Sequence, residues 1–254
     1  VVEAADQPLP KVFDPELGAY VKRQLQAAGM RVLTGTPVRS VSGSDRADGV
    51  VTDAGAIPAD IIVMSIGIRP ATEFLKGTDI EMFKGTIVVD EAMRTNIKDV
   101  YAAGDCALVK NAITGKPQWS AMGSTANITA RLLAKNIAGE SCAYHGCLGT
   151  GVVKLLPNLC AGRCGLGEDD AKAAGFDVVS AISVHDDKPK YYPDASYFII
   201  KLIADRKSRR LLGIQVVGSR MVDKMVDIAA TGISLKATVD SFDDIDFAYA
   251  PPFS

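Results

Sequence analysis

Residues 95–106 read Thr-Asn-Ile-Lys-Asp-Val-Tyr-Ala-Ala-Gly-Asp-Cys, and this stretch decides how the rest of the chain is interpreted. A polar turn leads into a short apolar run, Val100–Ala103, which has the length of a buried strand. We predict that this strand ends at Gly104. Open α/β sheets bind ligands at the carboxyl ends of their strands, and a glycine there lets a ligand approach the backbone. The carboxylate of Asp105 could accept hydrogen bonds from hydroxyl groups of such a ligand.

A Gly-Asp pair alone is usually a simple turn, but the twelve-residue pattern around it is much more specific. It resembles the second flavin-binding motif of the FAD-dependent pyridine nucleotide-disulfide oxidoreductases. The resemblance implies that Gly104 and Asp105 contact FAD, and that the Asp105 carboxylate holds the ribityl chain of the cofactor.

The composition is that of a globular protein with no strong charge bias. The 254 residues are enough for about two domains, and 48% of them are hydrophobic. A net charge of -2 gives no electrostatic reason to expect binding to nucleic acid or to an anionic membrane surface. No apolar run approaches the ~18 residues of a membrane span, and the first residues lack the features of a signal peptide. Five cysteines without framework spacing fit a reducing compartment, so we expect a cytoplasmic protein.

The glycine-rich signature of a dinucleotide site is missing from the sequence. A Gly-x-Gly-x-x-Gly loop after a strand is expected once for FAD and once for NAD, and neither occurs. Val1–Asp6 instead predicts the second strand of a nucleotide-binding unit, so we expect the chain to be the C-terminal part of a longer protein. In such units the acid at the end of this strand, here Glu3, binds the ribose hydroxyls of NAD. The alternative for Glu3 is a solvated acid at a strand end.

Helix and strand signals alternate through the first 90 residues, which predicts an incomplete Rossmann-like α/β region. Asp14-Pro15-Glu16 has the N-cap, the proline and the first-turn acid of a helix start, and Gly29 ends the helix. The largely apolar run Ala59–Gly67 predicts a central strand covered on both faces. The family resemblance implies that Gly67 lies against the nicotinamide ring, whereas from the residues alone it is equally well a turn glycine. The other predicted elements are a parallel strand over 31–34, a small meander over 38–52 and a strand over 86–89.

A long helix is predicted between Ser124 and Gly139. Helical spacing places four residues on its buried side: Ala126, Ala130, Leu133 and Ile137. The resemblance places the start of this helix beneath the flavin pyrimidine ring, with Met122 and Gly123 in contact and Asn127 in the next turn. Free N–H groups and the positive end of the helix dipole would stabilise the negative charge that develops at N1 and O2 of reduced flavin.

Beyond residues 141–148 the pattern changes to strands. Five strands are predicted over 151–156, 159–165, 178–184, 197–205 and 211–217, with helices over 168–174 and 222–233. They predict an antiparallel sheet with helices on one face, which is an α+β module. This module resembles the dimerisation domain of the same family, and Phe-Ala-Tyr-Ala-Pro-Pro-Phe-Ser at its end is the most specific match. Within the family, the Tyr-Ala-Pro-Pro ending points to the coenzyme A-disulfide reductase, NADH oxidase and persulfide reductase branch.

Two tyrosines lie in segments that match this branch, Tyr191 before Tyr192-Pro193 and Tyr249 before Ala250-Pro251-Pro252. The resemblance implies that they reach across a dimer into the partner's active site. A phenol with a pKa near ~10 remains a hydrogen-bond donor at neutral pH and could protonate a departing thiolate. The alternative is that both are packing tyrosines at an interface, and Tyr192 could replace Tyr191 as the inward-facing residue.

Other candidate redox and metal residues are set aside. Cys160 and Cys164 are four residues apart, which on a strand separates them by roughly 13 Å, whereas a disulfide needs Cα atoms within ~7 Å. The redox-active cysteine of the resembled family lies in a segment that this chain lacks, so no cysteine is assigned as a nucleophile. His145 and His185 have no partners at metal-ligand spacing, so we predict no metal site.

We therefore predict an incomplete Rossmann-like nucleotide-binding region followed by an antiparallel-sheet α+β dimerisation domain. The predicted segments are a partial NAD-binding domain over 1–85, a second FAD-binding segment over 86–140 and the dimerisation domain over 148–254. We hypothesise that the intact protein passes hydride from NADH or NADPH through FAD to a coenzyme A-type disulfide or persulfide. An NADH oxidase or peroxidase is the alternative within this class. In the alternative of another class, the chain as given is a non-catalytic, flavin-free dimerisation module, without tight FAD binding.

Overall fold

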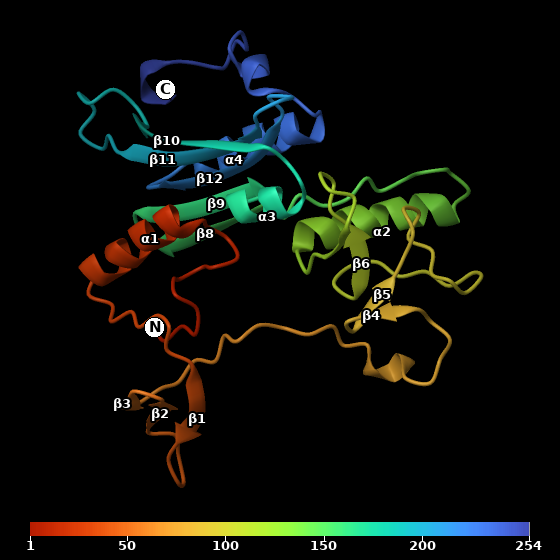
Figure 1. Cartoon of the computed structure of the whole chain (residues 1–254), viewed down its shortest axis with the longest axis horizontal. Coiled ribbons are helices and arrows are strands. Elements are labelled where there is room, and N and C mark those ends of the chain that lie inside the picture. Colours follow the sequence, from red (N-terminus) through yellow and green to blue (C-terminus); the bar gives the residue numbers. More distant parts are fainter. Residues whose placement is uncertain (254) are drawn as a thin grey trace. The chain divides into compact units, whose positions relative to one another are not determined.

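The protein, analysed as a computed structural model, is described for residues 1–253 and divides into two compact units. The first unit comprises Val1–Ile66 and Gly151–Ser254, and the second comprises Gly67–Thr150. Figure 1 colours the chain from red at its N-terminus to blue at its C-terminus. The combination of α/β and α+β structure predicted from the sequence is confirmed. The predicted division into three segments stays a prediction.

A five-stranded antiparallel sheet forms the core of the first unit, in the strand order β10-β11-β12-β9-β8 (Figure 1). Its strands are β8 (Gly151–Leu156), β9 (Leu159–Gly165), β10 (Val178–Asp186), β11 (Tyr197–Asp205) and β12 (Leu211–Gly218). All eight residues of β12 are buried because it lies in the middle of the sheet. The strands predicted beyond residue 150 are thus confirmed, with bounds that differ by at most two residues.

Helices cover both faces of this sheet, whereas the sequence predicted helices on one face. The helices of the unit are α1 (Pro15–Ala27), α3 (Glu168–Ala173) and α4 (Val222–Ser234). On β9, Ala161 belongs to the apolar cluster of α1, while a Cβ on the next residue, Gly162, would lie 2.9 Å from Val222 and Val226 of α4. Neighbouring residues of a strand point to opposite faces. Helix α1 therefore packs on the face opposite α4, and the close approach of α4 requires the glycine.

The N-terminal part of the first unit contains two small sets of strand pairings. Val2 and Leu33 form a parallel bridge, in which Glu3 N–H donates to the Leu33 carbonyl oxygen at 2.8 Å, so the parallel pairing predicted over 31–34 is limited to a single bridge. The predicted meander is confirmed as β1 (Val38–Ser42) and β2 (Gly49–Thr52). A third antiparallel strand, β3 (Gly55–Pro58), was not predicted.

The prediction of a central strand over Ala59–Gly67 is wrong. These residues form no strand, and the side chains of Ile61 and Val63 are 83% and 86% exposed. Figure 1 shows the stretch in orange as an extended trace without an arrow. A strand becomes covered on both faces only when neighbouring strands pair with it, and no strand among residues 1–253 does so.

The second unit has a four-stranded sheet in the order β4-β5-β6-β7, in which only β5 and β6 are parallel. Its elements are β4 (Met82–Phe83), β5 (Thr86–Val88), β6 (Ala107–Lys110), β7 (Pro117–Trp119) and α2 (Gly123–Ile137). Short 3-10 helices lie at Glu73–Leu75 in this unit and at Val239–Phe242 and Pro251–Phe253 in the first unit. The strand predicted over 86–89 and the helix predicted after Ser124 are confirmed.

The strand predicted to end at Gly104 is not formed. Within residues 1–253, only Tyr101 of the run Val100–Ala103 forms a β-bridge, which is an isolated antiparallel one to Arg94. The strand of this region is β6, which begins after the Gly-Asp pair. Here too the physical reason is the absence of a neighbouring strand, since an apolar run alone supplies no partners for its backbone groups. Gly104 therefore lies in the turn that leads into β6.

Candidate functional site

The turn at Gly104 is the best-defined part of the candidate site. Gly104 has a φ of +82°, in the left-handed region that favours glycine, and its carbonyl oxygen accepts a hydrogen bond from Ala107 N–H at 3.0 Å. Its own N–H donates to Thr129 Oγ1 at 3.3 Å. A Cβ on Gly104 would contact the Ala126 side chain at 3.7 Å. The structure thus brings the Gly-Asp pair against the first turns of α2.

Asp105 follows this turn and is exposed to solvent. Its backbone carbonyl oxygen accepts a hydrogen bond from Trp119 Nε1 at 2.7 Å, which ties the residue to the end of β7. Within the described part of the chain, the carboxylate has neither a hydrogen-bond nor an ion-pair partner. A fixed backbone with an open carboxylate suits the binding of hydroxyl groups from a ligand.

The start of α2 is open as well. Met122 occupies the N-cap position with an extended backbone, and no side chain caps the helix. Gly123 begins the helix, and a Cβ there would meet nothing within 4 Å. Asn127, one turn further, is exposed. The first backbone N–H groups of a helix have no partners within the helix, so together with the positive end of the helix dipole they can bind an anionic group.

Buried hydroxyl groups anchor α2, and they differ from the stripe that spacing predicted. Thr125 and Thr129 are buried, whereas Ala130 and Ile137 are exposed, so the predicted stripe is one residue out of register. Thr129 Oγ1 donates to the Thr125 carbonyl oxygen at 2.8 Å, and the Thr125 hydroxyl shares a 2.8 Å hydrogen bond with Ser120. Threonines at i and i+4 were a visible signal, but threonine is a poor indicator of burial.

Cys147 lies beside this hydroxyl network, where its thiolate form is disfavoured. Burial raises the pKa of the Cys147 thiol, and the hydrogen bond with Ser120 only partly opposes that effect. A thiol with a raised pKa is a poor nucleophile at neutral pH. In the first unit, the Cys160 thiol contacts the carbonyl oxygen of Ser219 at 3.6 Å rather than Cys164. The structure therefore gives no reason to assign either of these cysteines to catalysis.

The two residues predicted to contact NAD, Glu3 and Gly67, belong to different units. Glu3 belongs to the first unit, is half-buried, and its carboxylate accepts the N–H of Ala5 at 2.8 Å. Gly67 begins the second unit with a φ of +99° and open space where a Cβ would be. The positive φ favours glycine at this position, which is compatible with both the turn and the ligand interpretations.

Tyr191 and Tyr192 lie in the loop between β10 and β11, and the structure distinguishes them. The Tyr191 side chain is 73% exposed, and its ring lies 5.0 Å from the ring of Tyr192. Tyr192 is half-buried, with the Lys188 ammonium 5.6 Å from its ring centroid. Tyr191 is therefore the more exposed of the two tyrosines.

Tyr249 lies on the C-terminal segment, which borders an apolar cavity of about 660 Å³ in the first unit. The lining comes from β11, β12, α4 and this segment, and includes Leu202, Ile214, Met225, Ile228, Phe242 and Phe247. Tyr249 is exposed at the edge of the cavity. Tyr249 is therefore, like Tyr191, a tyrosine whose side chain is largely exposed.

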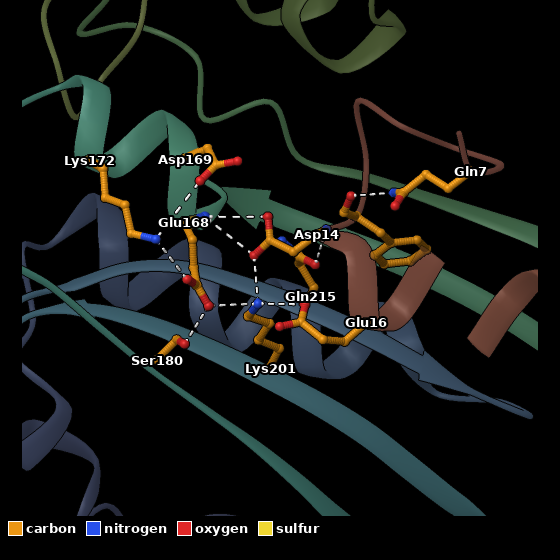
Figure 2. A network of polar contacts seen from close by, with 10 residues as sticks. Gln7, Asp14, Glu16, Glu168, Asp169, Lys172, Ser180, Lys201 and Gln215 are labelled. Carbon is orange, nitrogen blue, oxygen red and sulfur yellow. Dashed lines mark hydrogen bonds and ion pairs between the residues drawn. The ribbon is translucent and has the colours of Figure 1, made fainter. Parts of the chain in front are cut away.

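A buried lysine joins α1 to the sheet in the first unit. Lys201 of β11 is 1% exposed, and its Nζ lies 3.0 Å from Asp14, 2.9 Å from Glu16 and 2.7 Å from Glu168. Figure 2 shows the three carboxylates converging on the ammonium group. Asp14 was predicted to cap α1, but its side chain makes no cap bond and instead also accepts the N–H of Glu168.

The charged groups of this cluster form a structural lock, by which we mean that they pair with one another and hold α1 against the sheet. Burial of Lys201 opposes its charge, but hydrogen bonds to Glu168, Glu16 and Asp14 outweigh this effect and raise the pKa of Lys201. The hydrogen bonds from Lys201 and Ser180 lower the pKa of Glu168 to about 2. Lys201 and Glu168 therefore remain charged near neutral pH, so neither is suited to acid-base catalysis there.

The described part of the chain contains neither a cluster of metal-binding side chains nor a helix suited to a membrane. Among residues 1–253, no three His, Cys, Asp or Glu side chains are placed to hold a metal ion together. No helix in the same range is long and apolar enough to cross a membrane.

Comparison with protein families gives two matches that together cover most of the chain. Residues 1–126 match the family described as pyridine nucleotide-disulphide oxidoreductase. Residues 157–254 match the dimerisation domain of the pyridine nucleotide-disulphide oxidoreductases.

Individual relatives and solved structures agree with these matches. A CoA-dependent NAD(P)H sulfur oxidoreductase from Pyrococcus furiosus is 34% identical across all of this chain and 57% of its own length. An NADH oxidase from Methanocaldococcus jannaschii is 30% identical across all of this chain and 56% of its own length. The solved structure of an NAD-dependent persulfide reductase from A. fulgidus superposes with a TM-score of 0.95 and 34% identity, over the whole of this chain and 47% of that one. The chain therefore spans about half the length of the proteins that it matches.

Proposed function

Because the chain belongs to the pyridine nucleotide-disulphide oxidoreductase family, we propose that it forms part of an FAD-dependent enzyme that reduces sulfur compounds with NADH or NADPH. The substrate class is a disulfide or persulfide of the coenzyme A type, as the name of the Pyrococcus furiosus relative indicates for that protein. The carrying observation is the Gly104 turn, which lies against the uncapped start of α2 beside the open carboxylate of Asp105. The cysteine usage is compatible with a cytoplasmic location.

The residues present fit a flavin at this turn. Gly123 leaves open space where a side chain would stand, and the start of α2 has no competing cap. The Asp105 carboxylate is exposed and unpartnered within residues 1–253. A group that combines ribityl hydroxyls with a ring able to take negative charge matches a carboxylate next to helix N–H groups.

Each of these residues has a defined part in the proposed mechanism. When bound, FAD supplies an acceptor for hydride from nicotinamide and a donor of electrons to sulfur. Asp105 accepts hydrogen bonds from the ribityl hydroxyls, which orients the chain that carries the ring. The N–H groups at Gly123, flanked by Met122 and Asn127, stabilise negative charge on the ring. Gly67 gives the nicotinamide access to the backbone, and Glu3 binds ribose hydroxyls of the dinucleotide.

Two tyrosines of the first unit are the proposed proton donors of the mechanism. Tyr249 and Tyr191 both present exposed hydroxyl groups, and neutral phenols can donate a proton to a departing thiolate. Both act in the partner's active site, which requires a homodimer. Support for a homodimer comes from the match of residues 157–254 to a dimerisation domain and from the open apolar cavity beneath Tyr249. A two-fold symmetric pair is the expected arrangement.

The test of the flavin site uses the intact protein that contains this chain, because the chain alone is not expected to hold FAD tightly. Asp105→Ala should lower flavin affinity by about 10-fold or more, since hydrogen bonds to a charged group contribute about 1.5–3 kcal/mol each. Asp227→Ala, at an exposed aspartate on α4, is the matched control. Flavin retention after gel filtration and a titration of the apoprotein report the result. Equal affinities of the Asp105 and Asp227 variants would refute the assignment.

A second candidate function is an NADH oxidase, which the Methanocaldococcus jannaschii relative favours by its name. The intact protein, reduced by NADH without oxygen, would then be reoxidised by dioxygen faster than by coenzyme A disulfide. The sulfur-reductase proposal predicts the opposite order of rates. Measuring both reoxidation rates on one preparation separates the two functions.

A further inference from the structure

The loop that carries Tyr191 is closed at its base by a buried carboxylate. Asp187 is 1% exposed, although it lies directly after β10. Its Oδ1 accepts the N–H of Ser196 at 2.6 Å, and its own N–H donates to the Ser196 carbonyl oxygen at 2.9 Å. A buried carboxylate is costly unless it is paired, so a cation is required next to it.

Arg220, which lies between β12 and α4, supplies that cation and also reaches the far side of the loop. Its Nε donates to Asp187 Oδ2 at 2.7 Å, and its Nη1 donates to Asp194 Oδ2 at 2.6 Å. Its Nη2 donates to the Asp194 carbonyl oxygen. A planar guanidinium can hold several acceptors in fixed directions, which an ammonium group cannot. One side chain from outside the loop thus binds both of its arms.

Lys188 completes the cluster from within the loop. Its Nζ donates to Asp194 at 2.8 Å and lies over the ring of Tyr192. Hydrogen bonds from Lys188 and Arg220 lower the pKa of Asp194 to about 2, so this carboxylate stays charged near neutral pH.

The cluster has no charge left over for a ligand. Two cations, Lys188 and Arg220, face two carboxylates, Asp187 and Asp194, and all four are paired with one another. A phosphate or carboxylate ligand would have to break these pairs. The cluster is therefore suited to holding the loop. Tyr191 takes no part in these ion pairs, and its side chain is exposed to solvent.

We propose that Arg220 is a positioning residue for Tyr191, holding the loop of residues 187–196 so that the Tyr191 hydroxyl group is presented in one place. This inference rests on the proposed function, in which Tyr191 donates a proton during reduction of a sulfur substrate. Arg220 itself acts through Asp187 and Asp194, without touching substrate.

The first test measures the order of the loop directly. Lys190 and Tyr191 are exposed, but a protease needs the chain around the bond to unfold locally, so the rate of tryptic cleavage after Lys190 reports how firmly the loop is held. The Lys188–Pro189 bond resists trypsin because of the proline. Arg220→Gln and Asp194→Asn should each speed cleavage after Lys190 by about 10-fold or more, as expected when charge-assisted hydrogen bonds are lost. Asp194→Asn is the gentler variant, because this residue is exposed. Mass spectrometry of the fragments identifies the cleaved bond.

The matched control is Arg209→Gln, because Arg209 also forms a two-bond pair with an exposed carboxylate, that of Asp240. This variant should leave cleavage after Lys190 unchanged. Equal cleavage in wild type, Arg220→Gln and Asp194→Asn would overturn the role of Arg220 in holding the loop.

The second test asks whether Arg220 acts through Tyr191. In the intact protein, Arg220→Gln should slow turnover of coenzyme A disulfide by about 10-fold while leaving reduction of the flavin by NADH unchanged. In a Tyr191→Phe background, the same change should have no further effect on turnover, because the group that it positions is gone. Equal fold-losses in both backgrounds would overturn the inference. If Tyr191→Phe alone leaves turnover unchanged, the catalytic part of Tyr191 fails, while the cleavage test still decides whether Arg220 orders the loop.

Discussion

Strand β12 and the stretch over residues 59–67 are both apolar, but β12 is buried and the stretch is exposed to solvent. Strand β12 lies between β11 and β9, and each of its residues is buried. The stretch over 59–67 has no strand beside it within residues 1–253, and Ile61 and Val63 stand in solvent. Apolar composition is thus necessary for a buried strand but does not create one. Burial also requires neighbours that pair with the backbone and cover the side chains.

The energetic difference follows from the area removed from water. Burying apolar surface contributes about 25 cal/mol per Å², so a fully buried leucine or valine stabilises the fold by about 1.5–3 kcal/mol. The side chains over 59–67 contribute almost none of this. The chain spans about half the length of its relatives, and the proposed function assigns this stretch to a nucleotide-binding region.

The largest expected effect on the free energy of unfolding concerns a buried polar residue, Lys201, on the strand β11 that pairs with β12. Lys201→Met should destabilise the first unit by about 3–5 kcal/mol, because three carboxylates lose the cation that they share. Lys172→Met removes a largely exposed ion pair with Glu168 and should cost at most about 1 kcal/mol. Urea unfolding of both variants measures the difference, and similar losses would contradict a structural lock at Lys201.

Truncating apolar side chains in the two regions compares them directly. Leu212→Ala in β12 should cost about 2–5 kcal/mol, because it leaves a cavity in a packed core. Ile61→Ala should change the free energy of unfolding by less than about 0.5 kcal/mol, since the side chain is already in water. Chemical denaturation again gives both values. A comparable loss for Ile61→Ala would mean that the stretch over 59–67 is packed in solution.

Acid should weaken the sheet unit through Glu168. Because its folded pKa is about 2 and its ordinary value is 4.5, the ionised form favours the folded state. The stabilisation is fully present above about pH 4.5 and is lost as the pH falls towards 2, on the order of 1–2 kcal/mol after allowance for solvent screening. Glu168→Gln should remove this part of the pH dependence. An unchanged slope of stability against pH between 4.5 and 2 in that variant would argue against the assignment.

The smallest expected effect on stability concerns the exposed stretch itself. Ile61→Lys combined with Val63→Lys should leave the free energy of unfolding within about 0.5 kcal/mol of the original value. The two charges should nevertheless reduce aggregation, because an exposed apolar segment with little charge favours association. Light scattering on a concentration series compares the two proteins. Unchanged scattering would show that other surfaces dominate association.

The sequence by itself determined the elements whose signals are local. Helix α1 follows from Pro15, its periodic apolar residues and Gly29, and the five strands beyond residue 150 follow from short β-rich runs bounded by turns. The Gly104–Asp105 pair was selected from the contiguous motif over residues 95–106. All of these signals lie within about ten residues of the structure that they specify.

Only the tertiary structure decided which groups meet across long stretches of sequence. Asp14 and Lys201 are 187 residues apart, and no local pattern in either segment announces their contact. The same applies to Asp187 and Arg220, to the packing of α1 on the second face of the sheet, and to the absence of a strand over 59–67. The physical reason is common to all four. Burial and charge pairing depend on distant neighbours, and a sequence pattern states only what a segment could do once those neighbours are present.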